Sequence, residues 1–143
     1  MDRIDAHVHI WPTKRLRKLI QWYNRMVPNF KVDENITVDD ILMKLAEHDV
    51  AKVFNLVYPL TPDETVSLNR FNAALAREHS NVCAFGSLHQ GNENKEEILK
   101  FAFFELGLIG LKFHPFIQRM DLRDPSMEEV WKQFKDKDFL ESR

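Results

Sequence analysis

Residues 3–10 read RIDAHVHI, a short and largely apolar run that Pro12 closes two residues later. These features predict a β-strand. Because side chains alternate along a strand, Asp5, His7 and His9 share one side. Two imidazoles at this spacing lie about 6–7 Å apart at Cα, so both nitrogens can reach one metal ion. The alternative is a structural pair whose rings bond only to backbone or carboxylate groups.

The rest of the chain alternates between predicted helices and strands. The helices are expected over residues 13–26, 36–50, 61–80, 94–107 and 124–137, and the further strands over 51–59, 81–91 and 108–115. Thr37 is a plausible N-cap, and Gly107 is a typical residue for a helix end. Strands joined by helical crossovers favour a parallel α/β layer design. The strands are continuous apolar runs, so we expect both of their faces to be covered.

Residues with useful chemistry gather at the carboxyl ends of these strands. Tyr58 closes the second strand, His89 the third, and Lys112 and His114 the fourth. Ligands of parallel α/β folds bind at this edge, so the pattern predicts a pocket there. His89 taken alone also fits a solvated residue at a loop edge. The basic helix over residues 13–26 follows the first strand directly, and we expect it to flank the mouth of the pocket.

The composition is that of a globular chain. It has 143 residues, 44% hydrophobic and 29% charged, and a formal net charge of −2. This balance indicates no nucleic-acid or membrane partner, and no apolar run approaches the roughly 20 residues that a membrane span needs. Cys83 is the single cysteine, which fits a reducing compartment. We therefore expect a cytoplasmic protein.

Four segments together resemble one known family. They read IDAHVHIWP (4–12), EHDVAKVFNLVYP (47–59), LNRFNAALAREHSNVCAFGSLHQ (68–90) and ELGLIGLKFHPFIQRMDLRDPSMEEVW (105–131). In order and spacing they resemble the amidohydrolase-related (amidohydrolase 2) family of the metal-dependent amidohydrolase superfamily. The resemblance implies a TIM (β/α)8 barrel and a divalent metal, most often zinc. It also implies hydrolysis of C–N or C–O bonds, or non-oxidative decarboxylation of small carboxylates.

The resemblance also assigns expected roles to residues. His7 and His9 match the metal-binding pair at the end of the first strand. Lys112 lies where some members carry a carboxylated lysine that bridges two metals, although it also fits an interior lysine paired with a carboxylate such as Asp5. Lys112 and His114 are the candidate catalytic residues. The predicted substrate pocket is lined by Trp11, Tyr58 and His89.

The resemblance ends after the fourth strand and the start of the following helix. The expected fold is thus a TIM (β/α)8-type barrel truncated to about four βα units, with residues 1–131 as its N-terminal half and residues 132–143 as a divergent tail. The family's later metal-site residues have no counterpart, whereas a catalytic zinc needs about three protein ligands. A truncated gene product explains this pattern. The predicted function is a metal-dependent hydrolase or decarboxylase, incomplete as this chain. The alternative is an inactive half-barrel remnant that binds metal weakly, forms a homo-oligomer or joins a missing C-terminal half.

Overall fold

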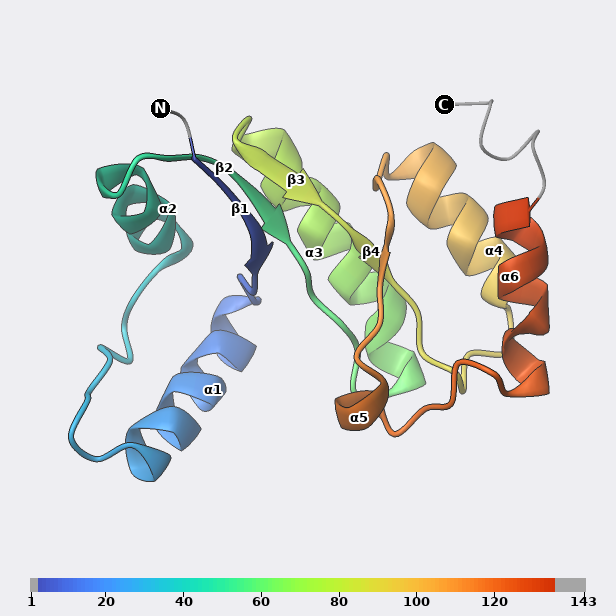
Figure 1. The fold of residues 1–143 in the computed structure, drawn as a ribbon, viewed down its shortest axis with the longest axis horizontal. Coiled ribbons are helices and arrows are strands. Elements are labelled where there is room, and N and C mark those ends of the chain that lie inside the picture. The colour runs from blue at the N-terminus through green and yellow to red at the C-terminus, as the bar shows by residue number, and fades with distance from the viewer. Residues whose placement is uncertain (1–2, 136–143) are drawn as a thin grey trace.

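The computed structural model describes residues 3–135, in which strands and helices alternate along the chain (Figure 1). The strands are β1 (Arg3–Val8), β2 (Val50–Asn55), β3 (Val82–Ala84), β4 (Gly86–Ser87) and β5 (Leu111–Lys112). The helices are α1 (Thr13–Met26), α2 (Val38–Glu47), α3 (Thr65–Glu78), α4 (Lys95–Lys100), α5 (Pro115–Gln118) and α6 (Glu128–Lys135). A π-helix, Phe101–Glu105, extends α4, and 3-10 turns at Pro62–Glu64 and Pro125–Met127 precede α3 and α6.

The described strands pair in parallel, as predicted. One sheet has the order β1-β2-β3 and the other consists of β4 and β5. The single strand expected over residues 81–91 divides into β3 and β4 at Phe85, whose N–H donates to the Asn55 carbonyl at 3.3 Å. The two sheets thus follow one another along the chain, and α3 crosses behind them in Figure 1.

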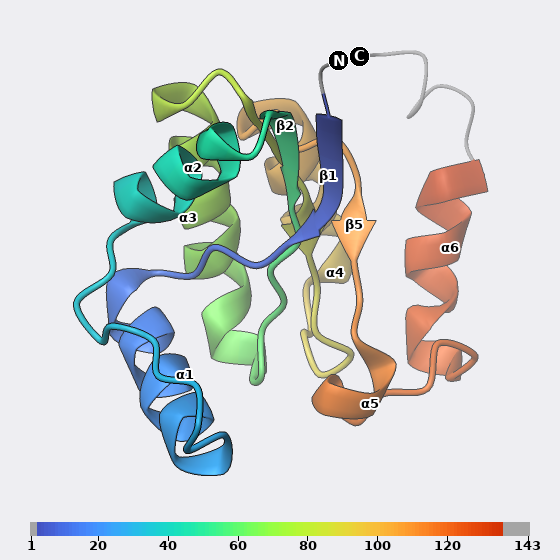
Figure 2. The same cartoon turned by 60° about the vertical axis from the view of Figure 1, so that its left-hand side comes forward.

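The predicted TIM-type barrel is wrong. The strands of residues 3–135 form two small sheets, of three and two strands, and no closed barrel. Closure of such a barrel requires eight strands that each pair on both sides. Here β1 and β5 are each hydrogen-bonded to one neighbouring strand, so the sheets stay open. The chain is a small open α/β fold (Figure 2).

The openness of the sheet also explains why β1 is not covered on both faces as expected. Most of its side chains are exposed, and Ile4 keeps 62% of its accessible surface. Burial begins only at Ile10, which is fully buried in a cluster with Val53 of β2 and Leu75 of α3. His7 therefore lies on an exposed edge strand instead of inside a core, and His9, just past the end of that strand, is partly buried.

The predicted roles of Thr37 and Gly107 at helix ends are confirmed, although α2 and α3 are shorter than the helices expected over residues 36–50 and 61–80. The Thr37 hydroxyl accepts from the N–H of Asp40 at 3.1 Å, and the Asp40 carboxylate accepts from the N–H of Thr37 at 2.9 Å. This reciprocal pair is a capping box, which satisfies two free donors at the start of α2. Gly107 follows the π-helix with a φ of 69°, a backbone conformation that favours glycine.

The end of the chain only partly falls within the structure. Helix α6 includes residues 132–135 of the predicted tail, and residues 136–143 lie outside the described residues. Within residues 3–135, every helix is too short or too polar to cross a membrane.

Candidate functional site

The two histidines of the opening strand converge at their ring nitrogens. His7 Nε2 and His9 Nε2 lie 3.1 Å apart. Two nitrogens bound to one zinc ion at about 2.0–2.1 Å are separated by about 3.3 Å at a tetrahedral angle. The spacing of the two atoms therefore fits two positions of a single zinc ion.

The ring of His9 is oriented by the backbone of the next strand. Its Nδ1 hydrogen-bonds the carbonyl oxygen of Leu56. Since a carbonyl can only accept, Nδ1 carries the hydrogen and the neutral ring has its lone pair on Nε2. Burial lowers the pKa of His9 below its ordinary value of 6.5; the bond to the Leu56 carbonyl opposes this shift, and the nearby charge of Lys112 adds to it. His9 is thus neutral near pH 7, as a metal ligand must be.

His7 lies on the solvent side of the pair. It is exposed, and its backbone N–H donates to the Asp5 carboxylate at 3.0 Å. Within residues 3–135 there is no group of three or more His, Cys, Asp or Glu side chains arranged to hold a metal ion. The pair therefore offers two ligands, and the remaining positions would fall to water, substrate or another chain.

Aromatic side chains connect the histidine pair to the ends of other strands. Trp11 is buried and stacks on His9, with ring centroids 6.0 Å apart. Tyr58 meets His9 edge-on at 5.9 Å and Trp11 at 5.1 Å. The ring of His114 also contacts Tyr58, with ring centroids 5.0 Å apart. The structure thus brings together four of the residues predicted from the sequence, from the segments that follow β1, β2 and β5.

Arg15 is the main site residue that the sequence analysis missed. Its guanidinium carbon lies 3.8 Å from the ring centroid of Trp11 and 5.8 Å from that of Tyr58. One of its nitrogens lies 3.3 Å from the Glu64 carboxylate. Burial lowers the pKa of Arg15, and the charge of the Glu64 carboxylate opposes this shift. Its place in the first turn of a helix that follows the strand directly was the available signal.

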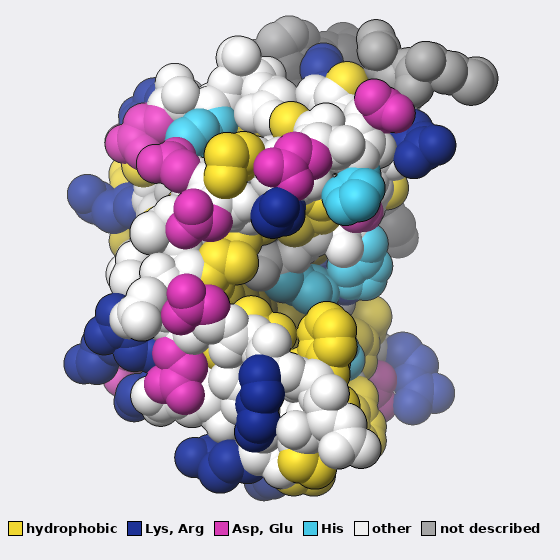
Figure 3. All heavy atoms as spheres, turned by 90° about the vertical axis from the view of Figure 1, so that its left-hand side faces the viewer, with side chains coloured by type: hydrophobic (Ala, Val, Ile, Leu, Met, Phe, Trp, Pro, Cys, Tyr) yellow, Lys and Arg dark blue, Asp and Glu magenta, His cyan; other side chains and the backbone are white. Residues whose placement is uncertain are grey.

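A cleft of about 900 Å³ opens beside these residues, between α1 and the segment around Tyr58. Its charged lining residues are Lys14, Arg15, Lys18 and Glu64, and its larger apolar ones are Trp11, Leu19, Trp22, Tyr58, Leu60, Leu68 and Ile117. His9 also lines it. Figure 3 shows histidine and hydrophobic side chains gathered around a hollow on this side of the molecule. A ligand in the cleft would contact both cationic and apolar groups.

Two predicted residues are placed differently from the aromatic cluster. His89 is not among the residues lining the cleft: its Nδ1 accepts from the N–H of Gly91 at 3.0 Å. Burial lowers its pKa, with Glu64 and Lys95 as charged neighbours. Lys112 ends β5, and its carbonyl accepts from the Ser87 hydroxyl at 3.0 Å. Within residues 3–135 it forms no ion pair with Asp5, so that predicted pairing is absent.

Buried asparagines position the ends of the strands. The Asn55 side chain bonds both backbone groups of Ile10, accepting from N at 2.6 Å and donating to O at 3.0 Å. It also donates to Asn72 at 2.7 Å, and Asn72 donates to the carbonyls of Asn55 and Phe85. Since Ile10 follows His9 directly, this network holds the histidine strand against β2 and α3.

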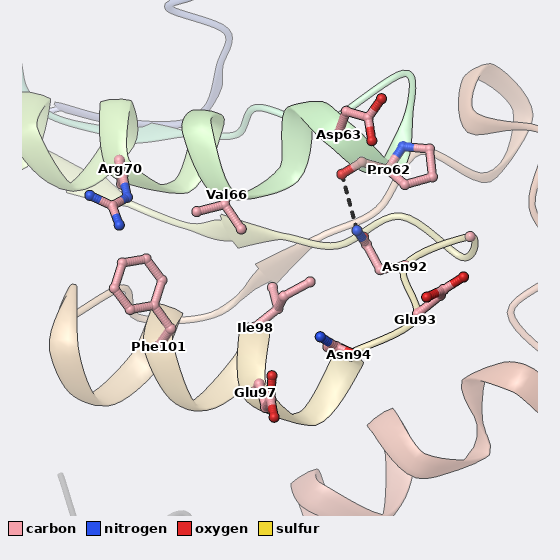
Figure 4. A pocket seen from close by; sticks show the side chains of 11 residues that line it. Pro62, Asp63, Val66, Arg70, Asn92, Glu93, Asn94, Glu97, Ile98 and Phe101 are labelled. Carbon is pink, nitrogen blue, oxygen red and sulfur yellow. Dashed lines mark hydrogen bonds between the residues drawn. The ribbon is translucent and has the colours of Figure 1, made fainter.

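A second cleft of about 740 Å³ lies between the start of α3 and the segment that includes α4 (Figure 4). Asp63, Glu93 and Glu97 contribute carboxylates to it, and Arg70 stacks on Phe101 at 5.0 Å. The Asn92 amide closes one side by donating to the Pro62 carbonyl at 3.0 Å. No histidine lines this cleft, so it is separate from the predicted metal ligands.

No protein-family model matches the chain, and the searches of curated proteins and of solved structures found no significant match either. The resemblance to the amidohydrolase-related family thus rests on the motifs quoted above.

Proposed function

We propose that this chain binds one divalent metal ion, preferably zinc, through His7 and His9, and acts in metal-dependent hydrolysis or decarboxylation of a small carboxylate. The observation that carries the proposal is the 3.1 Å separation of the two Nε2 atoms, combined with the bond that fixes His9 Nδ1 on Leu56. A zinc ion held there supplies a Lewis acid that polarises a bound oxygen.

Arg15 is the residue best suited to bind the carboxylate of the substrate. Its guanidinium faces the cleft, and the Trp11 ring and the Glu64 carboxylate hold it in place. Lys14 and Lys18 line the same cleft, so their charges favour an anionic ligand over a cationic one. The apolar residues of the cleft then cover the body of the molecule and exclude water.

Tyr58 and His114 are suited to handle hydrogen bonds and protons. Burial raises the pKa of Tyr58, so its hydroxyl remains protonated and can donate to a substrate oxygen. His114 Nδ1 accepts from the N–H of Ile117 at 3.4 Å, which leaves the proton of the neutral ring on Nε2. That N–H can donate a hydrogen bond to a substrate oxygen, and transfer of a proton to a leaving group or a carbanion requires the protonated form of the ring.

Metal binding without catalysis is the second candidate function. It is favoured by the ligand count, since the described residues offer the histidine pair and no group of three ligands. A two-ligand site binds zinc more weakly than a complete site, because affinity grows as the coordination positions are filled.

The metal proposal is tested by zinc titration and metal analysis of purified protein. We expect zinc to bind to the wild type and to be largely lost in His7→Ala and His9→Ala. His48→Ala is the matched control, because His48 is an exposed histidine at the end of α2. Zinc-dependent turnover of a panel of small carboxylates separates the catalytic proposal from metal binding alone. Zinc binding that persists in the double variant would contradict the site.

The carboxylate proposal is tested by tryptophan fluorescence during titration with benzoate, since Trp11 and Trp22 line the cleft. Arg15→Gln should weaken binding by about tenfold or more, because a charge-assisted hydrogen bond contributes roughly 1.5–3 kcal/mol. Arg25→Gln, at an exposed arginine in the last turn of the same helix, should change nothing. Equal effects of both substitutions would show that only the general charge of α1 matters.

A further inference from the structure

The incomplete ligand pair lies on a strand edge that faces solvent. β1 is the edge strand of its sheet, with β2 as its hydrogen-bonded neighbour, and His7 is exposed. A structural zinc site takes four ligands, and the described residues include no group of three. Two coordination positions are therefore left for groups from outside the pair.

The backbone directions on β1 suit pairing with a second strand. The Val8 carbonyl accepts from the N–H of Leu56 at 2.8 Å, so Val8 faces β2. The pairing of β1 is irregular between Asp5 and Val8, but both backbone groups of Ile10 bond to the Asn55 side chain. Val8 and Ile10 therefore face β2, and His9, just past the end of β1, turns toward the open edge. The His7 N–H agrees with this, since it donates to the Asp5 side chain and not to β2.

A twofold axis at Val8 would bring four imidazoles together. In an antiparallel pair centred there, His7 of each copy lies opposite His9 of the other, and all four side chains share one face. Residues directly opposite one another have Cβ atoms about 4.5–5.5 Å apart. Two His pairs, each with its Nε2 atoms 3.1 Å apart, then offer four nitrogens to one ion.

The surroundings of the strand also favour a second copy. Ile4 on β1 is 62% exposed, and an exposed edge strand with apolar side chains is a template for pairing. A self-complementary contact about a twofold axis closes after two copies, so it yields a dimer and not a filament.

We infer that one zinc ion joins two copies of this chain through His7 and His9 of each copy, across their paired β1 edges. This inference rests on the metal site proposed above. Four imidazoles fill the coordination sphere of zinc and leave no position for substrate, so the dimer and the catalytic state exclude each other.

The test uses the full chain, stripped of metal with EDTA and then titrated with zinc. Light scattering should show the mass rise to twice the 17.0 kDa of the chain, with an end point of one zinc per two chains. EDTA should reverse the change. His7→Ala and His7→Gln should remain monomeric, whereas His48→Ala and His114→Ala should dimerise like the wild type. Thermal unfolding without zinc verifies that each variant is folded.

Four results would overturn the inference in distinguishable ways. A monomer with one zinc per chain would refute the dimer but leave the proposed metal site standing. A chain that binds no zinc would refute both proposals. A dimer that forms without zinc and persists in both His7 variants would show that association depends on the apolar surface. Loss of the zinc dimer in His114→Ala alone would place His114 in the site and refute the four-imidazole arrangement.

Discussion

The carboxyl edge of the strands has two parts that use polar side chains in opposite ways. Around α3, the side chains of Asn55, Asn69 and Asn72 are fully buried and bond to backbone groups of neighbouring segments. At the end of β1, His7 is exposed and its ring nitrogen meets only the partner histidine among the hydrogen bonds of the described residues. The first part fixes the strands, and the second is free to meet a ligand.

The difference follows from what burial demands. Beyond the short ladders of β2 and β4, backbone groups would be buried without partners, and the asparagine amides bond to several of them. Within residues 3–135, every buried side-chain nitrogen and oxygen has a hydrogen-bond partner. At the exposed edge, water can form hydrogen bonds with polar groups. A histidine pair there therefore lowers the stability of the fold only slightly and is available to bind a ligand.

The largest expected effect lies in the buried part. Asn72→Ala leaves the carbonyls of Asn55 and Phe85 each without a hydrogen bond from the Asn72 amide. We expect a loss of roughly 3 kcal/mol in the free energy of unfolding, because each unsatisfied buried group costs roughly 1–3 kcal/mol. Urea unfolding measures the loss. Asn94→Ala is the control, since Asn94 is exposed and makes no capping bond. Equal losses in both variants would show that the buried asparagine contributes no more to stability than an exposed one.

A smaller effect is expected where a polar network is exposed. Thr37→Ala removes the hydroxyl of the capping box and should cost about 1 kcal/mol. Thr61→Ala is its control, because Thr61 precedes a 3-10 turn without a side-chain capping bond. Urea unfolding at neutral pH compares the two variants with the wild type.

The contribution of the Thr37 cap to the free energy of unfolding should also depend on pH. The Thr37 hydroxyl and N–H hold the pKa of the Asp40 carboxyl below its ordinary value of 3.8. A carboxyl whose pKa is lower in the folded state than in the unfolded state stabilises the fold at pH values above its pKa in the unfolded state. This stabilisation is lost as the pH falls through the pKa of the folded state. The difference between wild type and Thr37→Ala should therefore shrink below about pH 4. A difference that grows in acid would contradict this.

The smallest effect on stability is expected at the histidine pair. His7→Ala should change the free energy of unfolding by less than about 0.5 kcal/mol, since His7 is exposed. The rise in melting temperature that zinc produces should nevertheless disappear, because only a bound ligand stabilises the folded state by mass action. Differential scanning calorimetry with and without zinc measures both. A large loss of stability without zinc would indicate that the histidine pair serves to stabilise the fold and not to bind metal.

The site could be predicted in part because its residues follow local rules. Alternation along β1 was enough to expect His7 and His9 on one side, and the ends of parallel strands were enough to expect Tyr58 and His114 near them. Arg15 and the asparagines were missed. Asn55 and Asn72 bond across 17 residues of sequence, and no local pattern marks such a pair.

Local sequence also accounts for the parallel strands, the capping box at Thr37 and the glycine that ends the helical segment at Gly107. The capping box and the glycine depend on residues a few positions apart, whose backbone preferences act before any long-range contact forms. The parallel pairing was predictable because helical crossovers separate the strands along the chain. Whether the strands close into a barrel depends on how many pair with one another, and the barrel expected by resemblance is not formed by residues 3–135. The same holds for the exposure of β1: its apolar composition predicts burial, but an edge strand is buried only where another segment covers it.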